Sequence, residues 1–324
     1  MNYAERVRVL PQRTMRKLFI SLSHRRALAR MAVRTPITRP VVSRFVAGET
    51  LAEALPALDE LRRAGLRTTV DVLGESVTSR EHAAAAVERY LETIAALVGR
   101  GLDVNVSLKL TQMGLDIGPD ICLANVLRIV EAATAADGFV RIDMEDHYRT
   151  DATIAIWREV HERYPDVGIV IQTALRRSSA DVAAITAADG RIRLCKGAYD
   201  EPPSVAYRTK KAVDANYSRL VERLLLADAH PAIATHDARL VAEAIAVAER
   251  EGIGPDRFEF QMLYGIRRDL QRALVDRGYR VRIYVPYGTE WFPYFMRRLA
   301  ERPANVAFML RSVAHEEARR FRGR

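Results

Sequence analysis

A carboxylate-binding site is predicted by a run of aromatic, basic and acidic side chains near residue 300. In the segment Tyr294-Phe-Met-Arg-Arg-Leu-Ala-Glu-Arg-Pro-Ala-Asn305, a helix places four side chains on one face: Tyr294, Arg297, Arg298 and Glu301. Two adjacent guanidiniums offer forked sets of donors that match the two oxygens of a carboxylate, while the acid and the ring hold them still. Taken alone, such a segment is also typical of a solvated surface helix.

Reactive side chains also recur where short apolar runs end elsewhere in the chain. In order, the ends of eight runs carry Asp71 and Glu75, Lys109, Asp143 and Glu145, Gln172, Arg193 and Lys196, His236 and Asp237, Gln261, and Tyr284. If the runs are parallel strands of a barrel, their carboxyl ends converge on one face, where barrel enzymes carry their active sites. Because a functional group at nearly every strand end is hard to obtain by chance, we expect a single site there.

Two roles are open for Lys109 at such a strand end. It could add a third cation to the pair Arg297 and Arg298 around a bound carboxylate, or it could form a Schiff base as barrel aldolases do. Three neighbouring cations need counter-ions, and the sequence provides acids such as Asp143 and Glu75. The residues alone do not separate the two roles.

Neither a metal centre nor a disulfide framework is predicted. Cys122 and Cys195 form no CxxC pair, His236 and Asp237 are adjacent, and His147 directly follows two acids without a ligand spacing. So few cysteines fit a reducing compartment. With no secretory leader and no apolar run of about 20 residues, we expect a cytoplasmic protein, at most peripheral on the inner face of the cytoplasmic membrane.

The elements that position these residues alternate regularly after residue 50. Strands are predicted at Arg67–Leu73, Asp103–Leu110, Phe139–Glu145, Gly168–Thr173, Arg191–Lys196, Pro231–His236, Arg257–Leu263 and Arg280–Pro286. Helices are predicted between them, among others at Ser79–Val98, Pro119–Ala136, Asp151–Tyr164, Val205–Ala227, Asp237–Arg250 and Ile266–Asp276. Eight such units predict a (β/α)8 TIM-like barrel, with the arginine helix lying over its mouth. An open doubly wound sheet would need a glycine-rich phosphate turn, and Gly74 alone supplies none.

The amino-terminal segment differs from the rest in its charge. Residues 1–45 carry eleven basic side chains against the single acid Glu5, so the remainder of this chain of formal charge +9 is close to neutral. Apolar residues recur there at roughly helical spacing, which predicts a basic amphipathic arm over 1–48 and a catalytic barrel over 49–324. The arm could bind an anionic membrane surface or simply pack on the barrel. Nucleic acid is not expected as a partner, because aromatic residues are not interleaved with the charge.

At this point several segments together resemble the proline dehydrogenase family. They are Ser107-Leu-Lys109, Asp143-Met-Glu145, Arg193-Leu-Cys-Lys-Gly-Ala-Tyr199, Ala234-Thr-His-Asp237, Gln261-Met-Leu-Tyr-Gly265, Tyr284-Val-Pro286 and the arginine segment. They occur in the family's order and span residues 67–305. The chain is more similar to the short monofunctional bacterial enzymes than to the bifunctional fusions, since the residues after 305 are too few for an aldehyde dehydrogenase domain.

The resemblance implies a flavoenzyme that oxidises L-proline to Δ1-pyrroline-5-carboxylate. Hydride would pass to N5 of noncovalently bound FAD, and a membrane quinone would reoxidise the flavin. By matching position, the carboxylate of proline would be held by Arg297, Arg298 and Lys109, with Asp143 ordering them. The ring would be enclosed by Tyr284, Tyr199, Leu194 and Tyr294, and the gate acid that pairs with the first arginine would be Glu75.

The resemblance also implies a set of cofactor-binding residues. Arg193 would lie near the flavin N5 and Gln172 at the pyrimidine side of the ring system. The remaining contacts would come from Lys196, Gly197, Ala198, Thr235, His236, Gln261 and Leu263. Asp237 stands where some relatives have asparagine, so its own hydrogen bond is not carried over. A separate pyrroline-5-carboxylate dehydrogenase would use the product.

Two other functions are compatible with single features of the chain. A Schiff-base aldolase would use Lys109 or Lys196 on the same barrel, and borohydride trapping would reveal it. A lipid- or nucleic-acid-binding protein on an inactive barrel would use the basic arm, and its binding would be sensitive to salt. Neither alternative requires the full set of groups at the strand ends, so flavin-dependent oxidation of proline is the prediction.

Overall fold

The computed structural model describes residues 42–301 of the 324-residue chain. These residues form two compact units. The larger comprises residues 47–289, and the smaller joins residues 42–46 to 290–301. The predicted basic arm lies outside the described residues except for its last few positions, so the boundary expected at 48/49 stays a prediction.

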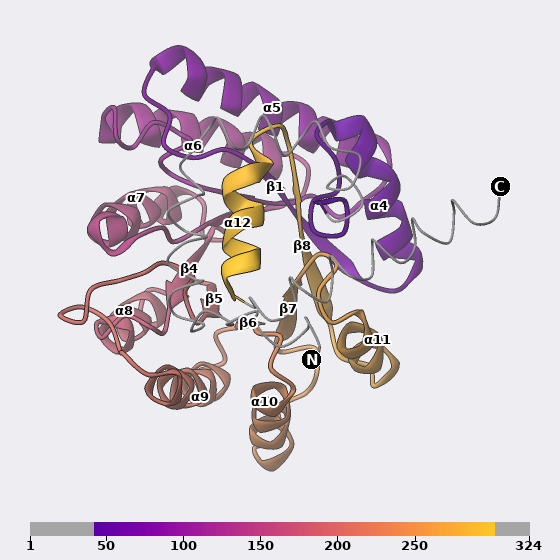
Figure 1. Ribbon diagram of the computed structural model, residues 1–324, viewed down its shortest axis with the longest axis vertical. Helices are drawn as coiled ribbons and strands as arrows, with labels where there is room; N and C mark the ends of the chain where they lie inside the picture. The colour runs from indigo at the N-terminus through magenta and orange to yellow at the C-terminus, as the bar shows by residue number, and fades with distance from the viewer. Residues whose placement is uncertain (1–41, 302–324) are drawn as a thin grey trace, which may run out of the picture. The chain divides into compact units, whose positions relative to one another are not determined.

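The larger unit is a closed barrel whose strands are all parallel and hydrogen-bonded in sequence order, with β1 closing on β8 (Figure 1). Within the described residues its eight strands are β1 (Arg67–Val72), β2 (Asn105–Leu108), β3 (Phe139–Ile142), β4 (Gly168–Gln172), β5 (Ile192–Cys195), β6 (Ala232–Ala234), β7 (Glu259–Leu263) and β8 (Val281–Tyr287). Each coincides with one of the predicted strands. Closure excludes the open doubly wound sheet and confirms the predicted (β/α)8 barrel.

Helices surround the strands on the outside of this unit (Figure 1). They are α4 (Leu51–Arg63), α5 (Arg80–Gly99), α6 (Pro119–Thr134), α7 (Thr150–Arg163), α8 (Ser178–Thr186), α9 (Lys210–Leu226), α10 (Ala238–Arg250) and α11 (Arg268–Asp276), with a short 3-10 turn η1 (His147–Arg149) before α7. Side-chain caps fix several starting points: Thr50 forms a capping box with Glu53, and Ser79 and Thr209 accept backbone N–H groups of α5 and α9.

Alternation along the strands explains how the barrel separates its core from its site. On β2 and β3, Val106, Leu108, Val140 and Ile142 are almost fully buried in the apolar core that also contains helix residues such as Tyr90. The intervening positions are polar, as are those of β1, β7 and β8. Because successive strand side chains point to opposite faces, the apolar set packs under the helices and the polar set fills the barrel interior.

The smaller unit contains α12 (Trp291–Glu301), the helix predicted from the arginine segment. Its aromatic residues pack together, with the ring of Phe295 at 5.9 Å from Trp291 and 6.1 Å from Phe45. The guanidinium of Arg298 lies 5.1 Å from the centre of the Tyr294 ring, one helical turn earlier. The predicted helix is therefore confirmed, and Tyr294 and Arg298 contact one another on it. The shared face of four side chains and the position of the helix over the barrel mouth stay predictions.

Candidate active site

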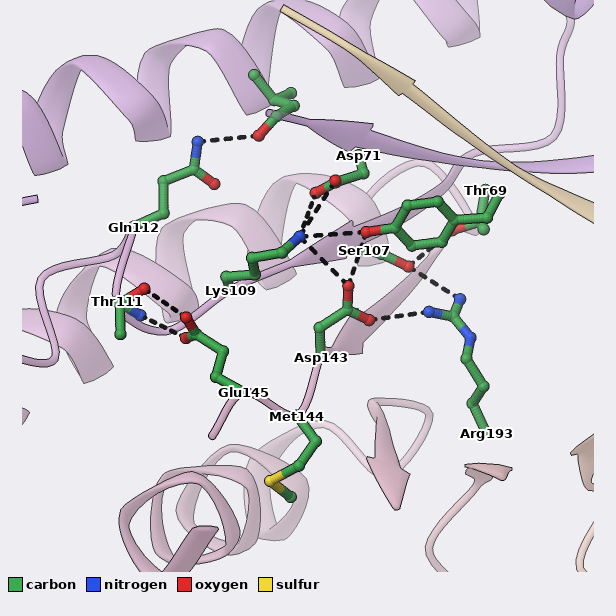
Figure 2. Close-up of polar contacts among 12 residues, drawn as sticks. Thr69, Asp71, Ser107, Lys109, Thr111, Gln112, Asp143, Met144, Glu145 and Arg193 are labelled. Carbon is green, nitrogen blue, oxygen red and sulfur yellow. Dashed lines mark hydrogen bonds and ion pairs between the residues drawn. The ribbon is translucent and has the colours of Figure 1, made fainter. Parts of the chain in front are cut away.

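A buried cluster of charged groups lies inside the barrel (Figure 2). Its residues come from the carboxyl ends of β1, β2 and β3 and from within β5 and β8. We call it the Lys109 cluster; its members are Asp71, Lys109, Asp143, Arg193 and Tyr284. Lys109 Nζ is 3.1 Å from both carboxylate oxygens of Asp71 and 3.2 Å from the Tyr284 hydroxyl. It is also 3.6 Å from Asp143 Oδ2. The ammonium is therefore held by two acids and a phenol.

Asp143 connects the two cations of this cluster. Its Oδ2 accepts a 2.8 Å hydrogen bond from the Tyr284 hydroxyl, and its Oδ1 accepts a 2.8 Å bond from the Arg193 guanidinium. Arg193 also lies over the Tyr284 ring, 5.3 Å from the ring centre. The position predicted to order the cationic site thus contacts Lys109, Arg193 and Tyr284 together.

Burial makes the charges of the cluster depend on one another. Asp71 is 0% exposed, Lys109 7%, Asp143 9% and Arg193 5%. Burial raises the pKa of Asp71 above its ordinary value, with Asp143 adding to the effect and Lys109 opposing it. Burial and both carboxylates raise the pKa of Tyr284 well above 10, so the phenol keeps its proton and remains a donor. Two acids face two cations, which leaves no surplus charge when all four are ionised.

Several residues that support the cluster were not predicted. Ser107 Oγ accepts a 2.9 Å bond from Arg193 and lies 3.0 Å from Thr69 Oγ1. The Tyr90 hydroxyl donates to the backbone oxygen of Ser107 at 2.7 Å. Alternation offered a signal for Ser107, which lies two residues before Lys109 on the same face of β2. Tyr90 comes from a helix and gave no comparable signal.

A second polar group involves Glu145 and Gln172, next to the loop after β5. Glu145 accepts bonds from the backbone N–H of Thr111 at 3.0 Å and from its hydroxyl at 2.6 Å, and burial raises the pKa of Glu145. Gln172 donates to the Glu145 backbone oxygen at 2.6 Å. Gly197 has φ +99°, and a Cβ there would lie 2.6 Å from Gln172 Oε1. The predicted cofactor loop therefore passes the predicted amide at a distance that requires glycine.

A third, more exposed group surrounds Lys196. Its ammonium is 2.7 Å from Asp214 and 3.6 Å from Asp237. Burial alone would raise the pKa of Asp214, but Lys196 and Lys210 outweigh burial and lower it. Asp214 is the residue that sequence reasoning missed here, because it lies on α9 away from any strand end. Lys196 is thus a cation held in place by carboxylates at the mouth of the barrel.

The remaining predicted residues in the barrel unit fall at or beside strand ends. His236 Nε2 accepts the backbone N–H of Leu263 at 2.8 Å, and the Thr235 hydroxyl accepts that of Asp237 at 3.2 Å. Gln261 accepts a bond from Arg193 Nε at 2.5 Å, which places it beside the Lys109 cluster.

Leu194 differs from its neighbour Arg193. It is 0% exposed and belongs to the apolar core, and alternation puts it on the opposite face of β5 from Arg193. The structure does not bring it into the polar cluster. Its predicted contact with the substrate ring has no support from this geometry.

Further predicted residues lie in loops or on α12. Glu75 lies in the loop after β1, and Ala198 and Tyr199 lie in the loop after β5; all three are partly exposed. Arg297 and Arg298 are partly exposed residues of α12 in the smaller unit. The Glu301 side chain is outside the described set. Their joint action with Lys109 stays a prediction.

Two kinds of feature are absent from residues 42–301. No group of three or more His, Cys, Asp or Glu side chains in this part of the chain is arranged to hold a metal ion. Over the same residues, no helix has both the length and the apolar character needed to cross a membrane.

Comparisons of the sequence with known proteins give one family. A family profile described as proline dehydrogenase matches residues 54–311. Proline dehydrogenase 1 of Bacillus subtilis is 39% identical over 92% of this chain and 99% of its own, and proline dehydrogenase of Deinococcus radiodurans is 41% identical over 88% and 98%.

Solved structures extend the likeness to the fold. The crystal structure of proline utilization A from Bdellovibrio bacteriovorus, inactivated by N-propargylglycine, matches with a TM-score of 0.77 and 27% identity. The match covers 89% of this chain and 36% of that longer one, so this chain spans about a third of the length of that protein. The family profile and the near full-length relatives agree, and the chain belongs to the proline dehydrogenase family.

Proposed function

We propose that the protein oxidises L-proline to Δ1-pyrroline-5-carboxylate with noncovalently bound FAD and passes the electrons to a membrane quinone. Membership of the family supports the reaction, and the Lys109 cluster is the single observation on which the assignment of residues depends. The cluster gathers two cations, two acids and a phenol around the carboxyl ends of β1, β2 and β3. Barrel enzymes bind their substrates at this end of the strands.

The donor groups at the barrel mouth fit a flavin. Arg193 uses three of its five N–H donors on Gln261, Asp143 and Ser107, which leaves two N–H donors for an electron-rich ring edge. Gly197 brings backbone close to Gln172, and Lys196 supplies a cation beyond it for a phosphate. Gln172, Arg193, Lys196, Gly197, Ala198, Thr235, His236, Gln261 and Leu263 would hold the cofactor.

Charge balance indicates how the substrate is bound. Lys109 and Arg193 are already matched by Asp71 and Asp143, so the carboxylate of proline adds a negative charge that the cluster does not neutralise. Arg297 and Arg298 of α12 are the groups proposed to supply the compensating positive charge, with Lys109 as the third donor. Glu75 and Glu301 would balance the arginines when no substrate is bound.

The proposed reaction depends mainly on how the substrate is positioned. Bound FAD supplies the hydride acceptor, and proline enters with its nitrogen unprotonated, so a dedicated general base is not needed. Tyr284 donates to Asp143 and cannot easily ionise, which keeps the Lys109 ammonium and Arg193 in fixed places. When the carboxylate of proline is anchored by the cations proposed to bind it, the proline ring is held in one orientation. Tyr199, Tyr284 and Tyr294 would exclude water from it.

The Schiff-base alternative is disfavoured by the surroundings of Lys109. Its nitrogen donates to Asp71 and Tyr284 and lies 3.6 Å from a second acid. A nucleophilic amine needs a free lone pair, and this environment favours the charged ammonium. Lys196 is likewise held by Asp214 and Asp237.

The membrane quinone implies contact with a bilayer surface. We propose a cytoplasmic protein whose basic arm, residues 1–48, binds anionic lipid peripherally, and whose product passes to a separate pyrroline-5-carboxylate dehydrogenase. Deleting residues 1–45 should abolish sedimentation with anionic vesicles in low salt. Undiminished sedimentation would remove the arm from this account.

Absorption spectra of the purified protein test the proposed function. A flavin band should be present and should bleach on anaerobic addition of L-proline, and a quinone should restore it. In parallel, Arg297→Ala and Arg298→Ala should raise KM for proline at least tenfold while the flavin band stays. A colourless protein, or a flavin that proline leaves oxidised, would contradict the proposal.

A further inference from the structure

The barrel interior contains a continuous series of hydrogen bonds that leads away from Arg193. Arg193 Nε donates to Gln261 Oε1 at 2.5 Å, and Gln261 Nε2 donates to Glu259 Oε1, also at 2.5 Å. Arg282 Nε then donates to both Glu259 oxygens, at 3.0 and 3.1 Å, and its other arm reaches Asp103 at 2.6 Å. We call this series the β7–β8 ladder. It runs from the candidate site towards the amino-terminal ends of the strands.

The charges of the ladder are fixed by its partners. Gln261 is 3% and Arg282 6% exposed, and the Glu259 side chain is 16% exposed. Burial by itself would raise the pKa of Glu259, but the charge and hydrogen bonds of Arg282 outweigh it, so the pKa is lowered. Glu259 is therefore a carboxylate, and an ionised carboxylate only accepts hydrogen bonds.

This acceptor dictates the orientation of the Gln261 amide. Its NH2 group must face Glu259, so its carbonyl oxygen must face Arg193 Nε–H, and the observed contacts agree on both sides. The reverse orientation would oppose the carbonyl to a carboxylate and the NH2 group to a guanidinium donor. Both contacts would then be repulsive.

We propose that Glu259 is a positioning residue that fixes Arg193 through the Gln261 amide. The proposal rests on the proposed function, which places Arg193 beside the flavin. The Arg193 guanidinium is held at Nε by Gln261 and at its two terminal nitrogens by Asp143 and Ser107. Losing the Nε contact removes one of three anchors, and the plane of the guanidinium can then turn.

Glu259→Gln is the variant that tests this role, and Asp103→Asn is its matched control. Both replacements remove a carboxylate from Arg282, but only Glu259 contacts Gln261. A glutamine at 259 cannot accept at both of its terminal atoms. Either its NH2 group opposes Arg282, or Gln261 turns over and opposes Arg193.

Arginine 15N–1H NMR of the protein gives a readout that does not depend on turnover. The Nε–Hε signal of Arg193, assigned by its loss in Arg193→Lys, should shift or broaden in Glu259→Gln and keep its position in Asp103→Asn. Gln261→Met should change the same Arg193 signal while leaving the Arg282–Glu259 pair intact. This variant replaces Glu259→Gln in the test if Glu259→Gln does not fold. An Arg193 signal unchanged by both ladder variants, or moved equally by Asp103→Asn, would overturn the proposal.

Kinetics then connects the position of Arg193 to the reaction. In Glu259→Gln, kcat for proline should fall about tenfold, the order expected for losing a hydrogen bond to a charged group, while KM changes less than twofold. Asp103→Asn should keep both parameters. If wild-type protein shows no flavin or no proline oxidation while the NMR response is as expected, the proposed function fails and the ladder stands. If KM rises and kcat is kept, Glu259 acts on substrate binding and the positioning role is wrong.

Discussion

At the scale of single residues, the site depends on an ammonium that lies between two buried acids. Lys109 lowers the pKa of Asp71, yet burial of Asp71 outweighs it and the net shift is upward. The Lys109 ammonium therefore limits the rise in the pKa of Asp71 that burial and Asp143 cause. Any change that removes this cation should raise the pKa of Asp71 further.

Lys109→Met should raise KM for proline by more than tenfold and should destabilise the fold in a pH-dependent way. Without the ammonium the pKa of Asp71 rises further above its value in the unfolded chain. A carboxyl with a raised folded pKa stabilises the fold at low pH, and that contribution is lost as the pH rises through the folded pKa. The deficit in urea-unfolding free energy relative to wild type should therefore be larger at pH 8 than at pH 5.

The double variant Lys109→Met, Asp71→Asn is the control for this prediction. It lacks the titrating group, so the part of the pH dependence caused by Asp71 should disappear. A deficit that is equal at pH 5 and pH 8 in the single variant would show that Asp71 does not respond to Lys109 in the folded protein.

The sequence named every member of this cluster but not how they pair. Asp71, Lys109, Asp143, Arg193 and Tyr284 were each expected because strand ends of a barrel converge. Their partners depend on the register between strands and on side-chain reach, which a one-dimensional pattern does not contain. The pairing of Arg193 with Gln261 joins residues 68 positions apart.

At the scale of elements, the strands were predictable because burial imposes a period of two. All eight were expected at the right places, but several were drawn too long at their carboxyl ends. Lys109, Asp143 and His236 lie just past the last residue of β2, β3 and β6. In these three strands, inter-strand pairing stops before the functional group, while the apolar pattern that signals a strand continues. Asp71, Arg193 and Tyr284 lie instead within paired strands. Two helices, α4 and α8, were not named, and α8 is only 9 residues long.

The loop after β5 passes close to Gln172 at Gly197, and replacing this glycine tests whether the close approach is needed. Gly197→Ala should destabilise the protein by about 1–3 kcal/mol, because φ is +99° and the new methyl group meets Gln172 at 2.6 Å. It should also weaken flavin affinity, since Gln172 must move. Thermal unfolding and flavin titration of the apoprotein measure the two effects.

Gly252→Ala separates backbone strain from the contact. Gly252 follows α10 with φ +65°, and nothing lies within 4 Å of a Cβ built there. It should cost about 1 kcal/mol of stability and leave flavin affinity unchanged. If the two alanine variants weaken flavin binding equally, the approach of the loop to Gln172 does not matter to the cofactor.

At the scale of the whole molecule, this barrel uses its interior for charge and its exterior for apolar packing. The sequence predicted functional groups at the strand ends but not a polar barrel interior. It did not indicate the β7–β8 ladder, because Glu259 and Arg282 lie near the starts of their strands, away from the end at which barrel sites are sought. How α12 meets this interior was predicted from the family resemblance and not from the pattern of the barrel.

Acid unfolding tests whether the buried charges stabilise the barrel. The folded pKa of Glu259 is lowered, so its contribution to stability is fully present above the unfolded value of about 4.3 and is lost as the pH falls through the folded pKa. The urea midpoint of wild type should therefore decrease from pH 5 towards pH 3. In Glu259→Gln this decrease should be shallower.

Asp214 contributes to the same acid dependence. Lys196 and Lys210 lower its pKa against the effect of burial, and Asp214 still titrates in Glu259→Gln. Adding Asp214→Asn should therefore make the dependence of the urea midpoint on pH shallower still. Parallel curves for wild type and Glu259→Gln would mean that Arg282 stabilises the glutamate equally in the unfolded chain, and the ladder would then contribute nothing to acid stability.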